Sequence, residues 1–299
     1  MSDDTGDAGT ASVSGKSLII TYRSLRLAIV LAVGMIFVSI IYEFFRAGYL
    51  RGSISAHFYS PVRSVFVGGL VMIGVSLVVI HVRHRWEETF LTLGGMLAII
   101  VAFVPTKVPW CEQDDVPGGA VQCRLVEADP DYPDWVKTLV ENNTVALMVT
   151  GVIALALTKK FAPKDDNGDN PSQLSFVLVI YAVLLLVGVI LFETWDLFAR
   201  NTHMMAAILT FACVGVTAAM NGWIRPLSEN PKRYRDIYRA VAICMVGAAV
   251  IYGIAKQFGG FEDDLFWLEA IELVIFAGYW LAQTAQHWNE KLEINDNPI

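Results

Sequence analysis

The chain has 299 residues, of which 55% are hydrophobic and 17% are charged, and its formal net charge is −7. Soluble globular domains contain about 45–50% apolar and about 25% charged residues, so this composition argues against a soluble domain and indicates a membrane protein. The acidic balance, without any basic stretch interleaved with aromatic residues, argues against nucleic acid as a partner.

The first 22 residues are predicted to form a disordered acidic tail, because "MSDDTGDAGTASVSGKS" is small, polar and poor in apolar side chains. The apolar run that begins near Leu25 is too long for a signal peptide and has no clear cleavage site, so we expect a permanent helix. The chain is then predicted to form a single transmembrane domain over residues 23–288, followed by a C-terminal tail at 289–299.

Apolar runs of about 18–21 residues are typical of membrane-spanning helices. Such runs lie near residues 25–45, 62–82, 89–105, 144–159, 174–193, 203–223, 237–256 and 265–286. The sequence therefore predicts an all-α, polytopic helix bundle with about eight spans. Seven spans also fit, because the third and fourth runs are short. Glycine pairs such as "TLGGML" are predicted to let helices approach closely.

The larger share of the 22 Lys and Arg residues falls on one side if the N-terminus is cytoplasmic, so both termini are expected in the cytoplasm. The longest loop, 106–143, is then external. Cys111 and Cys123 flank a Pro-Gly-Gly turn in this loop, which predicts a disulfide in an oxidising compartment. Two free thiols are the alternative.

The last apolar run, "LFWLEAIELVIFAGYWLAQTAQHW", contains ionisable residues. Glu269, Glu272, Tyr279, Gln283 and His287 recur at helical spacing and therefore share one broad face. Because a charged side chain at the bilayer centre costs about 2.5–3.5 kcal/mol on insertion scales, we expect this face to point towards other helices.

Other polar residues reach the same, outer side of the predicted bundle. Together with Glu269 and Glu272, the candidate site residues are Glu43, His57, Arg63, Glu193 and His203. The first interpretation is a polar, acidic cavity near the outer leaflet that binds a solute or an ion. The second is a set of interhelical ion pairs with a purely structural role.

A metal site is the alternative use of two of these residues. His57 and His203 with a glutamate would supply enough ligands for a metal. The sequence contains no HExxH motif, no Cys/His spacing typical of zinc sites and no nucleotide-binding fingerprint. We therefore expect no cofactor and leave the catalytic residues unassigned.

The segments "SISAHFYSPVRSVFVGGLVMIGVSLVVI", "EETFLTLGGMLAIIVAFVPT" and "EAIELVIFAGYWLAQTAQHW" resemble those of uncharacterised multi-pass membrane proteins of actinobacteria. The resemblance implies a bacterial cytoplasmic (inner) membrane and carries no activity. A remoter likeness is to alkaline-ceramidase-type membrane hydrolases, which combine a serine, an aspartate and three histidines around a metal. Only His57 and His203 share a side here, so that activity is not transferred.

We therefore predict an inner-membrane protein that binds or transports a small cationic or zwitterionic solute, or protons. Glu269 and Glu272 are its expected ligands or proton carriers. Membrane lipids and the solute or proton are the expected partners. The alternatives are a metal-dependent lipid hydrolase embedded in the membrane and a non-enzymatic membrane scaffold.

Overall fold

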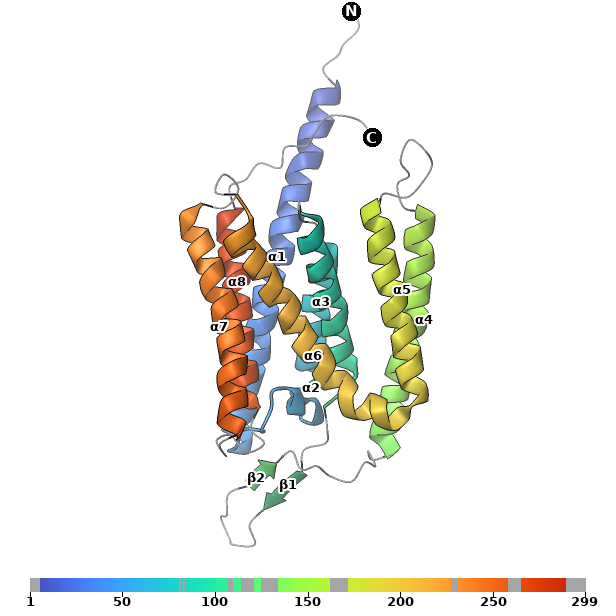
Figure 1. The fold of residues 1–299 in the computed structure, drawn as a ribbon, viewed down its shortest axis with the longest axis vertical. Helices are drawn as coiled ribbons and strands as arrows, with labels where there is room; N and C mark the ends of the chain where they lie inside the picture. The colour runs from blue at the N-terminus through green and yellow to red at the C-terminus, as the bar shows by residue number, and fades with distance from the viewer. Residues whose placement is uncertain are drawn as a thin grey trace, which may run out of the picture.

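A computed structural model describes residues 6–80, 82, 84–106, 110–113, 121–124, 134–161, 172–226, 231–257 and 265–288. Within these ranges the fold is helical apart from one pair of short strands (Figure 1). The long helices are α1 (Gly6–Ala47), α2 (Arg63–Val79), α3 (Arg85–Phe103), α4 (Asp134–Phe161), α5 (Ser172–Glu193), α6 (Trp195–Ala219), α7 (Lys232–Gln257) and α8 (Phe266–Gln286). The short elements are the 3₁₀-helix η1 (Ser55–Tyr59), the π-helix η2 (Met220–Ile224) and the strands β1 (Trp110–Gln113) and β2 (Val121–Arg124).

Each predicted apolar run overlaps one of the long helices, which confirms a multi-pass helical membrane protein. In the described part of the chain, 6 helices are long and apolar enough to cross a membrane: α1 from Ile20, α3, α4, α6 with η2, α7 and α8. Helix α2 and the Leu178–Phe192 part of α5 are apolar but shorter. α3 and α4, which have short apolar runs, reach spanning length because polar residues extend both helices.

The start of α1 and the end of α8 lie at one end of the bundle, here called the termini end (Figure 1). The strands and η1 lie at the opposite end, here called the hairpin end, and the α4–α5 pair stands beside the other helices. Large apolar side chains such as Leu31, Phe45 and Ile251 point outwards and are exposed. An apolar outer surface on long helices is what a hydrocarbon environment requires.

Helix α3 is held tightly between α2 and α6 by the predicted glycine pair. A Cβ atom added to Gly95 would lie 2.6 Å from the carbonyl oxygen of Gly74 on α2. A Cβ atom on Gly94 would lie 3.2 Å from the Cβ of Cys213 on α6. The two glycines therefore serve two different helix contacts, which confirms the close approach expected from the sequence.

Helix α1 begins at Gly6, well inside the segment 1–22 for which we predicted a disordered tail. Extending an existing helix by one residue costs much less than nucleating a new one, so a polar stretch can continue a stable apolar helix. Composition alone therefore placed the start of this helix too late.

Strands β1 and β2 pair antiparallel in the loop between α3 and α4, with Cys111 opposite Cys123. The side chains of these two cysteines lie outside the described residues. The cysteines that are described, Cys213 and Cys244, are free, and the structure gives no support for the predicted disulfide. The backbone register alone is described.

Helix α1 ends at Ala47, and the next residue is Gly48, whose φ of 81° suits a glycine and whose N–H donates to the carbonyl of Phe44 at 2.8 Å. Residues 49–62, here called the strap, then turn back into the hairpin end before α2 starts. The side chains of residues 53–58 in the strap are buried. This segment brings polar groups inside the bundle and positions several of the candidate site residues.

Candidate functional site

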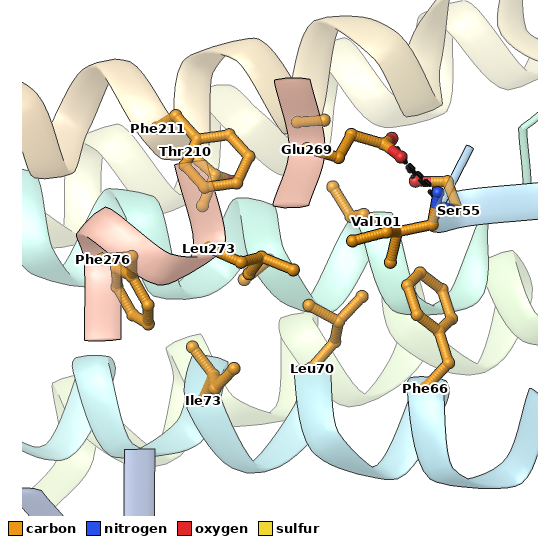
Figure 2. Close-up of a pocket in the computed structure, with 13 residues that line it drawn as sticks. Ser55, Phe66, Leu70, Ile73, Val101, Thr210, Phe211, Glu269, Leu273 and Phe276 are labelled. Atoms are coloured by element: carbon orange, nitrogen blue, oxygen red, sulfur yellow. Dashed lines mark hydrogen bonds between the residues drawn. The ribbon is translucent and has the colours of Figure 1, made fainter. Parts of the chain in front are cut away.

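Glu269, in the first turn of α8, binds the strap. Its carboxylate accepts hydrogen bonds from the hydroxyls of Ser53 and Ser55, both at 2.8 Å, and from the backbone N–H groups of Ile54 and Ser55. Figure 2 shows the contact with Ser55. Both carboxylate oxygens are used, so Glu269 joins the start of α8 to the strap between α1 and α2.

His57 lies within the strap and is buried. Its Nδ1 lies 3.1 Å from the carbonyl oxygen of Ser53, and because a carbonyl only accepts, Nδ1 carries the hydrogen. Burial lowers the pKa of His57 below its usual 6.5, while the bond to Ser53 acts in the opposite direction. The imidazole is therefore neutral at physiological pH.

Arg63, at the start of α2, lies over an aromatic ring. Its Cζ is 4.4 Å from the ring centroid of Phe58, which is a cation–π contact. Arg63 thus packs on Phe58 of the strap, the residue that follows His57 in the sequence.

Glu43, near the end of α1, is buried and pairs with Arg46 one turn later. The two guanidinium nitrogens lie 2.6 and 2.7 Å from the carboxylate oxygens, which is a bidentate pair. Arg46 is exposed, so the pair lies at the bundle surface. This ion pair lies within α1, whereas the structural interpretation of the sequence expected ion pairs between helices.

His203 on α6 caps the end of α3. Its Nδ1 lies 2.6 Å from the carbonyl oxygen of Val104. Tyr59 donates to Thr106 at 2.7 Å and Asn143 to Phe103 at 3.2 Å, so three elements satisfy the last carbonyls around this helix end. The Nε2 of His203 is buried and has no hydrogen-bond partner.

The side chain of Glu193, the last residue of α5, lies outside the described residues. Its place in the candidate site therefore stays a prediction.

Glu272 differs from the other described glutamates of the candidate site. It is 5% exposed, lies in the span Phe266–Gln286, and its Oε2 has no hydrogen-bond partner. Tyr279 and Gln283 follow on the same face of α8, where Gln283 donates to the Tyr279 hydroxyl at 3.0 Å. Within the described chain, Glu272 is thus a carboxyl group buried in a span without a polar partner.

One cavity lies close to these residues, between η1, α2, α3, α6 and α8 (Figure 2). Phe66, Phe211 and Phe276 contribute to its mostly apolar wall, and Glu269 is the candidate site residue that borders it. Its free volume of about 60 Å³ would hold a few water molecules or a small apolar group. The described cavity is therefore apolar, unlike the acidic cavity predicted from the sequence.

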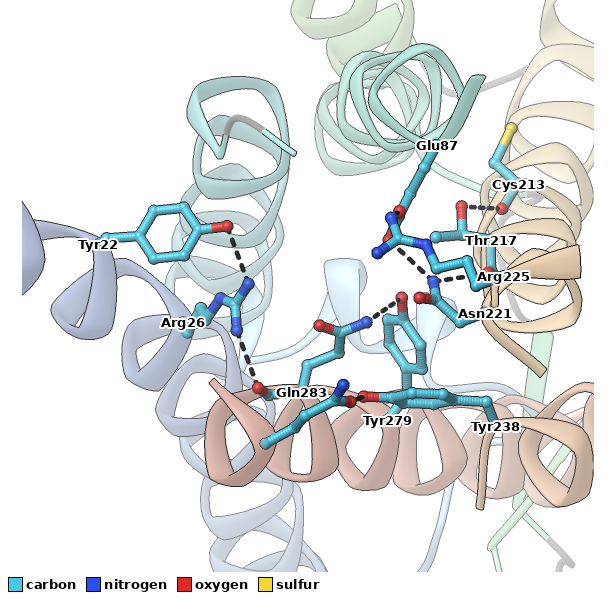
Figure 3. A network of polar contacts seen from close by, with 11 residues as sticks. Tyr22, Arg26, Glu87, Cys213, Thr217, Asn221, Arg225, Tyr238, Tyr279 and Gln283 are labelled. Carbon is cyan, nitrogen blue, oxygen red and sulfur yellow. Dashed lines mark hydrogen bonds and ion pairs between the residues drawn. The ribbon is translucent and has the colours of Figure 1, made fainter. Parts of the chain in front are cut away.

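A second polar cluster, at the termini end, was not predicted as a site (Figure 3). Glu87 in the first turn of α3 is 2% exposed, forms an ion pair with Arg225, and accepts a hydrogen bond from Asn221 at 2.8 Å. Asn221 lies in the π-helix η2, a local irregularity that is often found at functional sites. This cluster ties the end of α6 to the start of α3.

Arg26 on α1 lies in a neighbouring part of the same end. Its guanidinium donates to the backbone carbonyl of Gln283 and to the hydroxyl of Tyr22, both at 2.8 Å. From the sequence, Arg26 and Arg225 were used only among the basic residues that predict the orientation of the helices in the membrane. Arg26 lies inside the apolar run 25–45, and Arg225 lies just after the run 203–223. These positions were a signal that the two arginines lie near or inside the bundle.

No group of three or more His, Cys, Asp or Glu residues suited to a metal occurs within the described ranges. His57 and His203 each use Nδ1 on a backbone carbonyl and are held by different elements. No family model, curated protein or solved structure was found to match this chain. Functional inference therefore rests on the residues themselves.

Proposed function

We propose that this protein is a multi-pass membrane protein of the transport class, in which Glu272 binds and releases a proton or a small cation. The observation that supports the proposal is the buried carboxyl group of Glu272, which has no partner among the described residues. Glu43, Glu87 and Glu269 all have partners that account for their presence.

Ionisable residues inside spans are costly and usually mark proton or ion pathways. A carboxylate in such a place needs a counter-charge, and a proton or a small cation supplies one. The face of α8 that carries Glu272 continues through Tyr279 and Gln283 towards the termini end, so exchangeable groups recur along the helix. A small cationic or zwitterionic solute that moves with the proton is the cargo class that we propose.

We further propose that the termini end faces the cytoplasm of a bacterial cell. Helix α4 ends at this side with Lys159 and Lys160, and α7 begins there with Lys232 and Arg233. Cytoplasmic loops are enriched in such residues. Membership in the uncharacterised actinobacterial group is proposed on the three resembling segments alone.

The test is proton flux into liposomes that contain the purified protein, with a pH-sensitive dye inside and a potassium diffusion potential as the driving force. We expect the wild type to raise the flux above that of empty liposomes and Glu272→Gln to reduce it to that background. Asp236→Asn removes an exposed carboxylate and is expected to keep the wild-type flux.

A wild-type protein that raises no flux in any proton gradient would contradict proton transport. If Glu272→Gln has a normal folded yield and the proton flux of the wild type, Glu272 takes no part in transport. Equal folded yield is checked by the thermal unfolding midpoint of each variant in detergent.

A further inference from the structure

Arg26 carries a positive charge that no described carboxylate neutralises. It is 4% exposed and lies in the span that begins at Ile20. The guanidinium group of an arginine is a cation in proteins. Its hydrogen-bond partners, the hydroxyl of Tyr22 and the carbonyl of Gln283, are neutral (Figure 3). A buried charge of this kind calls for an anionic partner.

The guanidinium of Arg26 also has N–H groups that these two hydrogen bonds do not use. One N–H on each terminal nitrogen is used, while Nε is buried and has no hydrogen-bond partner. The ring of Tyr22 lies 4.5 Å from Cζ and stabilises the cation without accepting those hydrogens in the plane of the guanidinium. Planar, bidentate donors of this type match the oxygens of a carboxylate or a phosphate.

A second arginine lies one turn earlier on α1. Arg23 donates to the backbone carbonyl of Trp288, its Cζ lies 4.9 Å from the Trp288 ring centroid, and its Nε is again buried without a partner. The carboxylate of Glu87, which lies in the polar cluster at the same end, is occupied by Arg225 and Asn221. Two positive charges therefore face the same boundary between α1 and the end of α8.

We propose that Arg26, assisted by Arg23, forms a binding site for an oxyanion at the termini end between α1 and α8. The bound group is a phosphate or a carboxylate, supplied either by the headgroup of an anionic phospholipid or by a small anion in solution. Arginine side chains and aromatic rings near a helix end are the elements by which membrane proteins hold such headgroups. The site is independent of Glu272, so either proposal can fail alone.

The test uses the full-length protein in a neutral detergent and measures its thermal unfolding midpoint. In one arm sodium phosphate is compared with sodium chloride at equal ionic strength. In the other, phosphatidylglycerol is compared with phosphatidylcholine in mixed micelles. A ligand that binds only the folded state raises the midpoint. A rise with phosphatidylglycerol alone identifies a lipid headgroup, and a rise with phosphate as well identifies a free anion.

We expect the rise to be lost in Arg26→Gln and retained in Arg233→Gln, which removes an exposed basic residue at the same end. Arg26→Lys keeps the charge and should retain part of the rise. If Arg26→Gln does not fold, Arg23→Gln takes its place, and a smaller rise than in wild type supports the site. No rise in the wild type with either probe, or a full rise in the variant that is tested, overturns it.

Discussion

Glutamates in the membrane-embedded helices differ in what surrounds their carboxylates. Glu43 is paired with an arginine at the surface, Glu87 with an arginine and an amide inside, and Glu269 with hydroxyls and N–H groups of the strap. A buried carboxylate is stable only where an opposite charge neutralises it or hydrogen bonds solvate it. Glu272 lacks these contacts in the described chain, which is why it carries the functional proposal.

Replacing Glu269 tests its structural role. Glu269→Ala leaves the donors of Ser53, Ile54 and Ser55 without an acceptor, and we expect a loss of about 1–3 kcal/mol in stability. Glu269→Gln keeps one acceptor oxygen and should lose less. The thermal unfolding midpoint in detergent measures both, with Asp236→Asn as the control at an exposed site. Wild-type stability in Glu269→Ala would show that the strap is held by its apolar contacts alone.

His57 predicts a pH dependence of stability. Its pKa is lower in the folded protein than in the unfolded chain, so the unfolded chain binds a proton first as the pH falls. The contribution of the buried, neutral His57 to the free energy of unfolding is complete above about pH 6.5, the pKa of a histidine in the unfolded chain. It is lost as the pH falls through the lower pKa of His57 in the folded protein.

We therefore expect the unfolding midpoint to fall as the pH is lowered below about 6.5, and to fall less in His57→Gln. The control is His84→Gln, which removes a histidine from the opposite end of the molecule. An equal pH response in His57→Gln and the wild type would assign the effect to other groups.

At the scale of helices, the contact between α2 and α3 depends on the absence of side chains. In Gly95→Ala the new methyl group would meet the carbonyl oxygen of Gly74, which is backbone and moves only if the helices separate. We expect a loss of about 1–3 kcal/mol. Gly68→Ala on α2 is the matched control, because its Cβ would have no atom within 4 Å. Unfolding midpoints that agree for the two variants would contradict this account.

Helix α8 shows which features of the candidate site can be predicted from the sequence. Helical spacing predicted that Glu272, Tyr279 and Gln283 share a face turned away from lipid, and all three are buried. Spacing within one helix cannot tell which partner that face meets, because the partner comes from a segment far away in sequence. Glu269 was therefore predicted as a ligand, whereas it binds the strap. The buried position of Arg26 depends in the same way on α8, which brings the carbonyl of Gln283 to it.

At the scale of the whole molecule, the orientation in the membrane is open to a direct measurement. Single cysteines are introduced by Lys232→Cys at the termini end and by Lys137→Cys near the start of α4, and intact cells are treated with an impermeant maleimide. We expect labelling at position 137 and none at 232 until the cells are lysed. The unchanged protein measures the background from the 4 cysteines of the chain. The reverse pattern would place both ends of the chain outside.

The bond between the strap and α8 also bears on how the protein is made. Ser53 and Glu269 are separated by 216 positions in the sequence. Most of the helices are therefore synthesised before the Glu269 carboxylate, which accepts the hydrogen bonds of the strap, exists. Until then the hydroxyls and N–H groups of the strap must stay at the aqueous boundary, since they have no partner in lipid. Docking of the strap onto Glu269 therefore has to follow the synthesis of α8. A product that stops before α8 would keep an open hairpin end, which quality-control proteases could recognise.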